Sequence, residues 1–411
     1  MERKNVVIIT VLVALSVFLA WRFLRPMNIF IVSEAFERPI PVKALPAAVE
    51  NQGAKACGLC HTEIYSEWST TMHRQAWIDP YFQTDWKFDG SQQICKNCHI
   101  PLQDQQEHLV VGFRDKDKWD PILEPNPHFD AALQHEGVTC NVCHLREGKI
   151  LGPNARTNAP HAVTKMDNSN QVCVRCHVVS GDRWDTFFRF PPCGTVAEIE
   201  AGRGRRLSRS GEVTAENLAS LGCVECHMPA VSRPLVAGGR PRNTRRHLWR
   251  GGHDPKMVRQ GLDVQFTRQA ETAGKDPKFV LRLENVGAGH FLPTGTPDRF
   301  LSVALRLLDK EGKTIEENRA VLKRTVMWRP FIVDLWDTRL APHEPRTFPL
   351  EYSKARYPKA ETVEAVVRYH LLDEARRRRI DYRNTEPIEY EVYRKRLPLG
   401  GDSVKHRESH P

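Results

Sequence analysis

One short pattern constrains this chain more than any other feature: two cysteines separated by two residues and followed directly by a histidine. Ten of the 11 cysteines belong to five copies of it. The copies are Cys57-Gly-Leu-Cys60-His61, Cys95-Lys-Asn-Cys98-His99, Cys140-Asn-Val-Cys143-His144, Cys173-Val-Arg-Cys176-His177 and Cys223-Val-Glu-Cys226-His227. Two thiols at this spacing form thioether bonds to the vinyl groups of a haem, and the histidine ligates its iron. The repetition therefore predicts five covalently bound haems c.

Two other interpretations of the cysteines are weaker. A disulfide framework gives no reason for a histidine after every second cysteine. Zinc ribbons use paired Cys-x-x-Cys motifs, so the first four copies could form two four-thiolate zinc sites. That arrangement leaves five histidines unexplained and the fifth copy without a partner. The eleventh cysteine, Cys193, is interpreted as an idle thiol, because the sequence around it offers no base to activate it.

The composition agrees with haem binding. A chain of 411 residues is long enough for two or three domains, yet only 40% of its residues are hydrophobic. Porphyrins are large apolar discs, so five of them would replace part of a side-chain core. The net charge of +10 would be offset by about ten haem propionates. We therefore expect no nucleic-acid partner, and the sequence carries no recognised nucleic-acid-binding motif.

The N-terminus carries an apolar run from Val6 to Ala20, preceded by the basic residues Arg3 and Lys4. Such a run is either the core of a signal peptide or a membrane anchor. We favour an uncleaved anchor, because no small-x-small cleavage site follows closely and Trp21 extends the run to a length that spans a bilayer. The basic start favours a cytoplasmic N-terminus. The body is then expected in the periplasm, at a bacterial inner membrane.

Composition divides the chain into five segments, which we expect to be an anchor, a tether, two domains and a tail. Residues 1–25 form the anchor, and the proline-containing residues 26–53 form an extended tether. Residues 54–257 hold all five motifs, and residues 258–372 hold no cysteine. Residues 373–411 form a basic tail, which is either solvated or docks an acidic partner or lipid headgroups. The expected fold class is α+β, with a loop-rich, mainly helical pentahaem domain followed by a β-sandwich.

Element patterns differ between the two domains. Successive motifs begin 38, 45, 33 and 50 residues apart, which is too irregular for a solenoid. Helices are expected over residues 62–77 and 214–221, and proline-rich loops such as 121–127 elsewhere in the pentahaem domain. In the C-terminal half, strands are expected over residues 279–284, 300–308, 346–352 and 363–369, with a turn at 309–312.

Five irons can accept five further ligands, and 12 of the 17 histidines lie outside the motifs. Bis-histidine ligation is the usual low-spin state of electron-transfer haems. Six histidines are candidates because they lie near a motif, on a rigid element or beside glycines: His73, His135, His161, His247, His253 and His290. The other six, for which a surface or core role is the simpler interpretation, are His108, His128, His343, His370, His406 and His410.

The first motif also carries a family resemblance. It is followed by Tyr65, Trp68 and His73, and this order is similar to the opening of cytochrome c-554-type multihaem cytochromes. The segments 135–144 and 226–229 resemble that family too, so the likeness covers roughly residues 50–255. It implies closely packed, mostly bis-histidine haems that carry electrons, and it implies that His73 and His135 are distal ligands. The fifth motif, the anchor and the β-domain depart from the family's four-haem pattern.

Two classes of function follow. We expect an electron-transfer protein of a respiratory chain, with no catalytic residues, that exchanges electrons with a redox partner protein or a membrane quinol system. The alternative is a haem-dependent oxidoreductase that acts on a small nitrogen or sulfur compound at one five-coordinate haem. Pentahaem nitrite reductases replace one motif histidine by lysine, and all five motifs here end in histidine. A third possibility is quinol dehydrogenation, which agrees with the N-terminal anchor but does not account for the β-domain. The sequence also permits association into homo-oligomers.

Overall fold

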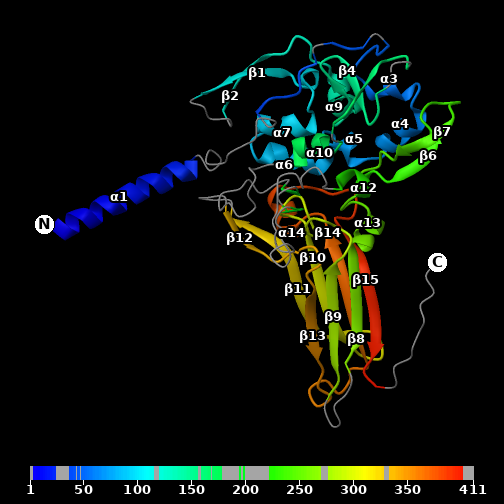
Figure 1. Ribbon diagram of the computed structural model, residues 1–411. Coiled ribbons are helices and arrows are strands. Elements are labelled where there is room, and N and C mark those ends of the chain that lie inside the picture. Colours follow the sequence, from blue (N-terminus) through cyan, green and yellow to red (C-terminus); the bar gives the residue numbers. More distant parts are fainter. Residues whose placement is uncertain are drawn as a thin grey trace, which may run out of the picture.

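The computed structural model describes residues 3–24, 37–42, 44–46, 48–114, 120–155, 159–167, 169–177, 194–195, 198–199, 222–269, 276–327 and 333–400. An N-terminal helix precedes a region of short helices and small sheets, and two larger antiparallel sheets follow (Figure 1). The expected α+β class is therefore confirmed. The division into five segments remains a prediction.

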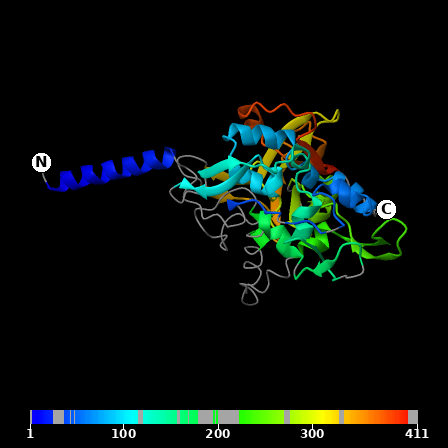
Figure 2. The same cartoon turned by 90° about the horizontal axis from the view of Figure 1, so that it is seen from above.

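The N-terminal helix α1 spans Arg3–Leu24. At about 1.5 Å per residue it is roughly 33 Å long, which matches the hydrocarbon core of a bilayer. Its apolar side chains are exposed, and it lies apart from the rest of the chain in both views (Figures 1 and 2). The stretch Lys4–Trp21 is long and apolar enough to cross a membrane, and a signal sequence would have the same properties.

The helices of the motif region are short, and four of them end on a motif histidine. These four are α7 (Gln93–His99), α9 (Cys140–His144), α10 (Asn170–His177) and α12 (Cys223–His227). The others are α3 (Ala54–Gly58), α4 (Thr62–Ser69), α5 (Met72–Gln75), α6 (Pro80–Phe88), α8 (Ala131–Gln134) and the 3-10 helix Gln103–Gln105.

The helix expected over residues 62–77 is broken into two parts. The Thr71 side chain accepts a hydrogen bond from the Arg74 amide, which caps the start of α5 and interrupts the helix that began at Thr62. The helix expected over residues 214–221 lies outside the described residues. Asp79 caps α6, and proline stands at the first position of that helix.

Small sheets occupy part of the stretches expected to be loops. They comprise β1 (His108–Phe113) with β2 (Pro121–Pro125), β3 (Leu145–Arg146) with β4 (Lys149–Gly152) and β5 (Val163–Lys165), and β6 (Ala230–Pro234) with β7 (Pro241–Arg245). Prolines bound β2 at both ends, because a two-stranded ribbon has free edges that do not need their N–H groups. The expectation of loops was therefore wrong for residues 121–125.

The C-terminal half forms two antiparallel sheets. The larger has the order β12-β11-β10-β14-β15, and the smaller has the order β13-β9-β8. Their strands are β8 (Leu262–Arg268), β9 (Lys278–Asn285), β10 (Phe300–Leu308), β11 (Thr314–Met327), β12 (Val333–Asp337), β13 (Arg346–Glu351), β14 (Thr362–His370) and β15 (Glu389–Pro398). The four strands expected from the sequence are confirmed as β9, β10, β13 and β14.

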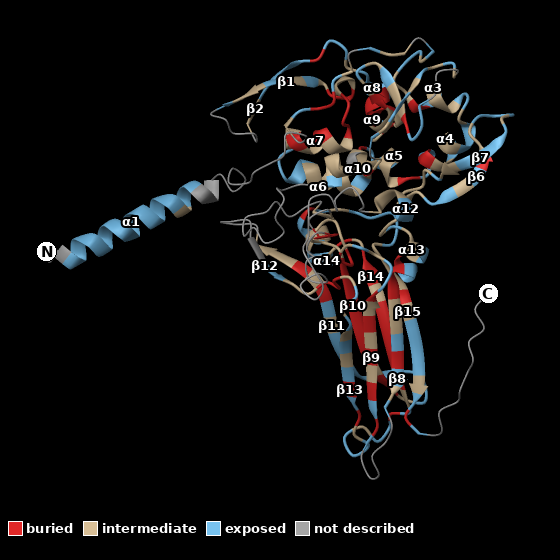
Figure 3. Ribbon diagram, in the orientation of Figure 1, coloured by how far each residue is buried: buried red, intermediate tan, exposed pale blue. Residues whose placement is uncertain are grey.

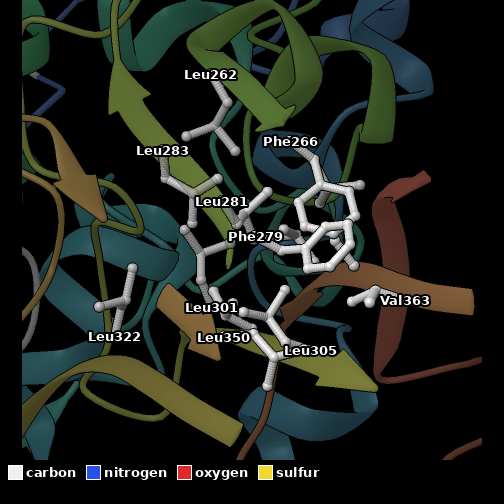
Figure 4. Close-up of a cluster of buried hydrophobic side chains, with 14 of the residues drawn as sticks. Leu262, Phe266, Phe279, Leu281, Leu283, Leu301, Leu305, Leu322, Leu350 and Val363 are labelled. Atoms are coloured by element: carbon white, nitrogen blue, oxygen red, sulfur yellow. The ribbon is translucent and has the colours of Figure 1, made fainter. Parts of the chain in front are cut away.

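The two sheets share one apolar core. Phe279, Leu281 and Leu283 alternate along β9 and are 0% exposed. They pack against side chains of the larger sheet such as Leu301 and Leu305 (Figure 4). Nearly every residue of β10 and β14 is buried, which Figure 3 shows as red strands between paler edges. Polar side chains of these strands are buried too, such as Ser302 of β10 and Glu364 of β14.

The predicted basic tail needs a correction. Residues 389–398 form β15, which pairs with β14 at the edge of the larger sheet. The four arginines from Arg376 to Arg379 lie on α14 (Glu374–Arg379). Arg376 donates hydrogen bonds to Asp85 at 2.7 Å and to Asp89 at 2.9 Å, so this part of the basic run binds the motif region rather than solvent.

The motif region lies across one end of the two sheets, as both views show (Figures 1 and 2). Polar contacts hold it there. The Tyr81 hydroxyl donates to Asp298 at 2.9 Å, and the Tyr390 hydroxyl donates to the Gly252 carbonyl at 2.7 Å. Helix α13 (Pro255–Gly261) leads from one part into the other. The loops at this end of the sheets therefore face the motifs directly.

Candidate haem-binding sites

Four of the five motif histidines are oriented by a backbone carbonyl. In each, the Nδ1–H donates to a carbonyl oxygen, at 2.8 Å for His61 to Leu235, 2.5 Å for His99 to Ala76, 2.8 Å for His144 to Leu151 and 2.7 Å for His227 to Arg250. Such a bond fixes the tautomer, so that Nε2 keeps its lone pair and points away from the carbonyl. This is the arrangement that an axial imidazole ligand needs.

Four motif histidines also stand opposite a second histidine. The ring centres are 6.3 Å apart for His61 and His161, 6.4 Å for His177 and His73, 6.2 Å for His144 and His247, and 6.4 Å for His227 and His290. A metal–nitrogen bond of about 2 Å and a further distance of about 1.1 Å from nitrogen to ring centre, counted on both sides of the metal, would separate two opposing imidazole ring centres by roughly 6.2 Å. The four pairs therefore have the spacing that one iron between them requires.

Burial keeps six of these eight imidazoles neutral. It lowers the pKa of His73 to about 3, and the pKa values of His177 and His247 to about 4. The pKa values of His144, His161 and His290 are lowered for the same reason. A neutral imidazole has the free lone pair that a metal takes. The residues present thus fit bis-histidine haem iron, both in geometry and in protonation.

The second motif differs from the other four. Its His99 stacks on Phe82, with ring centres 3.5 Å apart and planes 8° from parallel. Within the described part of the chain, no imidazole stands opposite His99 at the spacing of the four pairs. Burial lowers the pKa of His99 to about 4, so it too is neutral.

Two of the six expected distal histidines have other surroundings. His135 is exposed, and its Nδ1–H donates to the Ala131 carbonyl at 2.7 Å. His253 has its Nε2 3.3 Å from an Arg299 nitrogen. In the described residues, neither ring lies opposite a motif histidine. The assignment of His135 and His253 as iron ligands therefore gains no geometric support, whereas His73, His161, His247 and His290 gain it.

His290 comes from the C-terminal half of the chain, although the motif opposite it belongs to the N-terminal half. It lies in the connection between β9 and β10, where Asn285 donates to its carbonyl at 2.7 Å. Its Nδ1–H donates to the Phe291 carbonyl at 2.9 Å. Close by, the fully buried Glu198 accepts a hydrogen bond from the Arg339 guanidinium at 2.6 Å. The two-sheet region thus contributes a side chain to the fifth motif's site.

None of the ten motif cysteines forms a disulfide, and three pairs of them bring different motifs together. The side chains of Cys57 and Cys140, of Cys98 and Cys176, and of Cys173 and Cys223 lie close enough to interact. The interaction between Cys57 and Cys140 lowers the pKa of Cys57 and raises that of Cys140. In the described residues, no group of three or more side chains gathers as a zinc site would require. Cys193 lies outside the described residues.

Several residues of these sites could not be identified from the sequence. Trp249 contacts both His73 and His247, with ring centres 4.9 Å and 5.2 Å apart. Glu67 accepts a hydrogen bond from the His247 amide at 2.8 Å. The sequence offered only the proximity of Trp249 to His247, since Glu67 is 180 residues away from its partner.

Comparison with known proteins agrees with this geometry. The family model described as "Cytochrome c554 and c-prime" matches residues 56–119. A solved structure of a penta-heme cytochrome c552 from Thermochromatium tepidum is similar with a TM-score of 0.59. That match has 20% identity and covers 86% of this chain and 100% of the other. It therefore extends beyond the motif region into the two sheets.

Another solved structure, a Northeast Structural Genomics Consortium target, has a TM-score of 0.17 and 10% identity. It covers 36% of this chain and 92% of its own, and its similarity is too low to carry an argument. No curated protein matches the chain. The family match over residues 56–119, the similar fold and the repeated motif together confirm the resemblance of this chain to the cytochrome c-554 family.

Proposed function

We propose that this chain is a multihaem c-type cytochrome, a membrane-anchored, periplasmic electron-transfer protein of a respiratory chain that binds five haems c. The observation that carries the proposal is the set of four histidine pairs with ring centres 6.2–6.4 Å apart. Two imidazoles leave an iron no open position, so these sites are suited to passing electrons and not to binding substrate. The bound haems would supply the redox chemistry, and the protein residues hold and orient them.

The proposed ligand sets follow from the pairs. The motif histidines His61, His144, His177 and His227 are the proximal ligands, opposed by His161, His247, His73 and His290 respectively. The ten motif cysteines provide the thioether attachments. Burial keeps six of these imidazoles neutral, and backbone carbonyls orient His61, His144 and His227. Both features favour this assignment, because a protonated or freely rotating ring would bind iron weakly.

The thiol contacts support a compact order of electron transfer. They bring the first motif beside the third, the second beside the fourth, and the fourth beside the fifth. The thiols of Cys143 and Cys176 also interact electrostatically, which links the third motif to the fourth. The fourth motif is therefore the proposed branch point, and every motif has a neighbour to which an electron can pass.

Electron paramagnetic resonance of the oxidised protein tests the main proposal. We expect four low-spin ferric signals, one for each histidine pair. Replacing a distal ligand in His161→Ala should remove one low-spin signal and leave the other three. A protein with fewer than four low-spin haems, or a His161→Ala variant with an unchanged spectrum, would overturn the ligand assignment.

The membrane location rests on α1. The 22-residue helix is exposed and long enough to cross a bilayer, and the c-type haem sites require an exported body. The proposed partner is a membrane quinol system or a soluble redox protein. A variant that lacks residues 1–24 behind a cleavable export signal should be soluble and keep its haems. If the full-length protein is also recovered in the soluble periplasmic fraction, the helix is a signal sequence and not an anchor.

A second candidate function rests on His99. Because its ring has no imidazole opposite it among the described residues, the iron of the second motif would keep an open position there. An open position permits a haem-dependent oxidoreductase that acts on a small nitrogen or sulfur compound. Carbon monoxide binding to the reduced protein separates the two functions. Binding at one haem together with turnover of nitrite or hydroxylamine supports the enzyme, and no binding leaves electron transfer alone.

A further inference from the structure

One carboxylate lies at a junction between two of the proposed haem sites. Glu67 is on α4, the helix that begins directly after the motif histidine His61. It accepts a hydrogen bond at 2.8 Å from the backbone amide of His247, the proposed distal ligand of the third motif. Its side chain is only 11% exposed. A carboxylate from the first motif's helix therefore holds the backbone of the third motif's ligand.

Two arginines surround this carboxylate. The Arg233 guanidinium lies 2.8 Å from one Glu67 oxygen and donates to the other at 2.9 Å, so the pair is bidentate. Arg246 donates to Glu67 at 2.8 Å. Arg233 is 6% exposed, whereas Arg246 is 46% exposed. Charge-assisted bidentate bonds in a partly dry site fix geometry more firmly than surface ion pairs do.

Arg233 reaches the same ligand from the other side. It donates to the Arg245 carbonyl at 3.1 Å, and that carbonyl also accepts the Nδ1–H of His247 at 3.0 Å. The ion pair of Glu67 and Arg233 therefore holds the backbone on both sides of Arg246. The amide of His247 binds Glu67, and the carbonyl of Arg245 binds Arg233 and sets the plane of the His247 ring.

The hairpin of β6 and β7 extends this support to the first motif. Arg233 is on β6, and Arg245 ends β7, next to α4 in Figure 1. Just after β6, the Leu235 carbonyl accepts the Nδ1–H of His61 at 2.8 Å. The Ala237 amide donates to the Cys60 carbonyl at 3.2 Å. The same hairpin thus orients the proximal ligand of the first motif and, through Arg233, the distal ligand of the third.

We infer that Glu67 and Arg233 are positioning residues that set the orientation of the His247 ring, and that the Glu67 carboxylate lowers the reduction potential of the third motif's haem. This inference rests on the proposed ligation of that haem by His144 and His247. A fixed negative charge near the iron stabilises the ferric form relative to the ferrous form, because the ferric form carries one more positive charge. The Glu67–Arg233 ion pair also fixes the angle between the imidazole planes of His144 and His247, which is 32°.

The first experiment replaces the carboxylate by an amide in Glu67→Gln. We expect one low-spin resonance signal to move and the potential of the same haem to rise, with the other signals and potentials unchanged. A separate His247→Met variant identifies which signal belongs to this haem. Glu63→Gln is the matched control, because Glu63 is one turn away on the same helix and lies 3.6 Å from Arg233 but is 59% exposed. It should change neither readout.

The outcomes separate the inference from the proposed function. If Glu67→Gln folds with a full haem content and its spectrum and potentials match the wild type, the positioning role is wrong. Equal shifts in Glu67→Gln and Glu63→Gln would also overturn it, because they would report charge on α4 in general. If His247→Met changes no signal, His247 is not a ligand and the proposed function fails at this site. If Glu67→Gln does not fold, the test uses Arg233→Lys, which keeps the positive charge but loses the bidentate bond. This variant must then shift the same resonance signal.

Discussion

Truncation of one leucine in the two-sheet core should change the spin state of one particular haem. Leu281 is 0% exposed at the middle of β9 and faces Leu301 and Leu305 of the larger sheet (Figure 4). The connection that leaves β9 carries His290, which stands 6.4 Å from His227. The perturbation Leu281→Ala therefore weakens the scaffold of a proposed iron ligand without touching the ligand.

The magnitude follows from the burial. Leucine-to-alanine changes in cores cost about 2–5 kcal/mol, and the cost rises with the cavity that remains. Leu281 is surrounded by hydrogen-bonded strands of its own sheet and by fully buried leucines of the opposite sheet. These neighbours cannot shift far enough to fill the cavity that alanine would leave. We expect about 3–5 kcal/mol, a large fraction of the roughly 5–15 kcal/mol that stabilises a typical domain.

Denaturant titration provides the assay, with far-ultraviolet circular dichroism to follow the sheets and resonance spectra to follow spin states. In Leu281→Ala, the sheets should begin to unfold at a lower denaturant concentration than in the wild type. That unfolding should coincide with a change in the spin state of one of the five haems. The neighbouring change Arg282→Ala is the control, because Arg282 alternates to the other face and its side chain is 33% exposed. The reasoning is refuted if the sheets unfold while every haem keeps its spin state, or if all haems convert together.

Two further predictions concern other contacts. Burial raises the pKa of Asp85 to about 6 despite the nearby Arg376, so the folded protein holds this proton to a higher pH than the unfolded chain, whose pKa is near 3.8. The free energy of unfolding should therefore fall as the pH rises from about 4 to about 6, by at most about 3 kcal/mol. Melting curves of Asp85→Asn should show no such dependence of stability on pH. Melting curves of the control Asp89→Asn should still show it, because Asp89 is 55% exposed. A slope that survives in Asp85→Asn would contradict this. Gly137 has a φ of +63°, and a Cβ there would lie 2.6 Å from the His73 carbonyl oxygen. Gly137→Ala should displace that backbone and alter one low-spin signal, whereas Gly238→Ala, at φ +72° with open space around it, should alter none.

The sequence predicted the chemistry of this chain better than its architecture. The motif residues, four of the C-terminal strands and the α+β class were readable, because each depends on local spacing or alternation. Strand β15 was missed because its basic residues resemble a solvated tail, yet Arg394 and Arg396 pair with the buried Glu364 of the neighbouring strand. Such pairing between strands is set by tertiary contacts that local patterns do not reveal.

The distal ligands show the same limit. The sequence made six histidines candidates and the resemblance favoured His73 and His135, but only the fold distinguishes those that stand opposite a motif histidine. His161 lies 100 residues after its partner His61, and His290 comes from the other half of the chain. Glu67 had no signature at all, because its role depends on a contact with the backbone of residue 247. Long-range geometry of this kind cannot be derived from spacing.

Haem content per polypeptide tests the central claim most directly. The protein, matured in a host with c-type haem attachment, is quantified by its alkaline pyridine spectrum against amino-acid analysis. The account predicts five covalently bound haems, and four for a variant in which Cys223 and Cys226 are both replaced by serine. A wild-type content of four or fewer in fully matured protein, or an unchanged content in the variant, would contradict it.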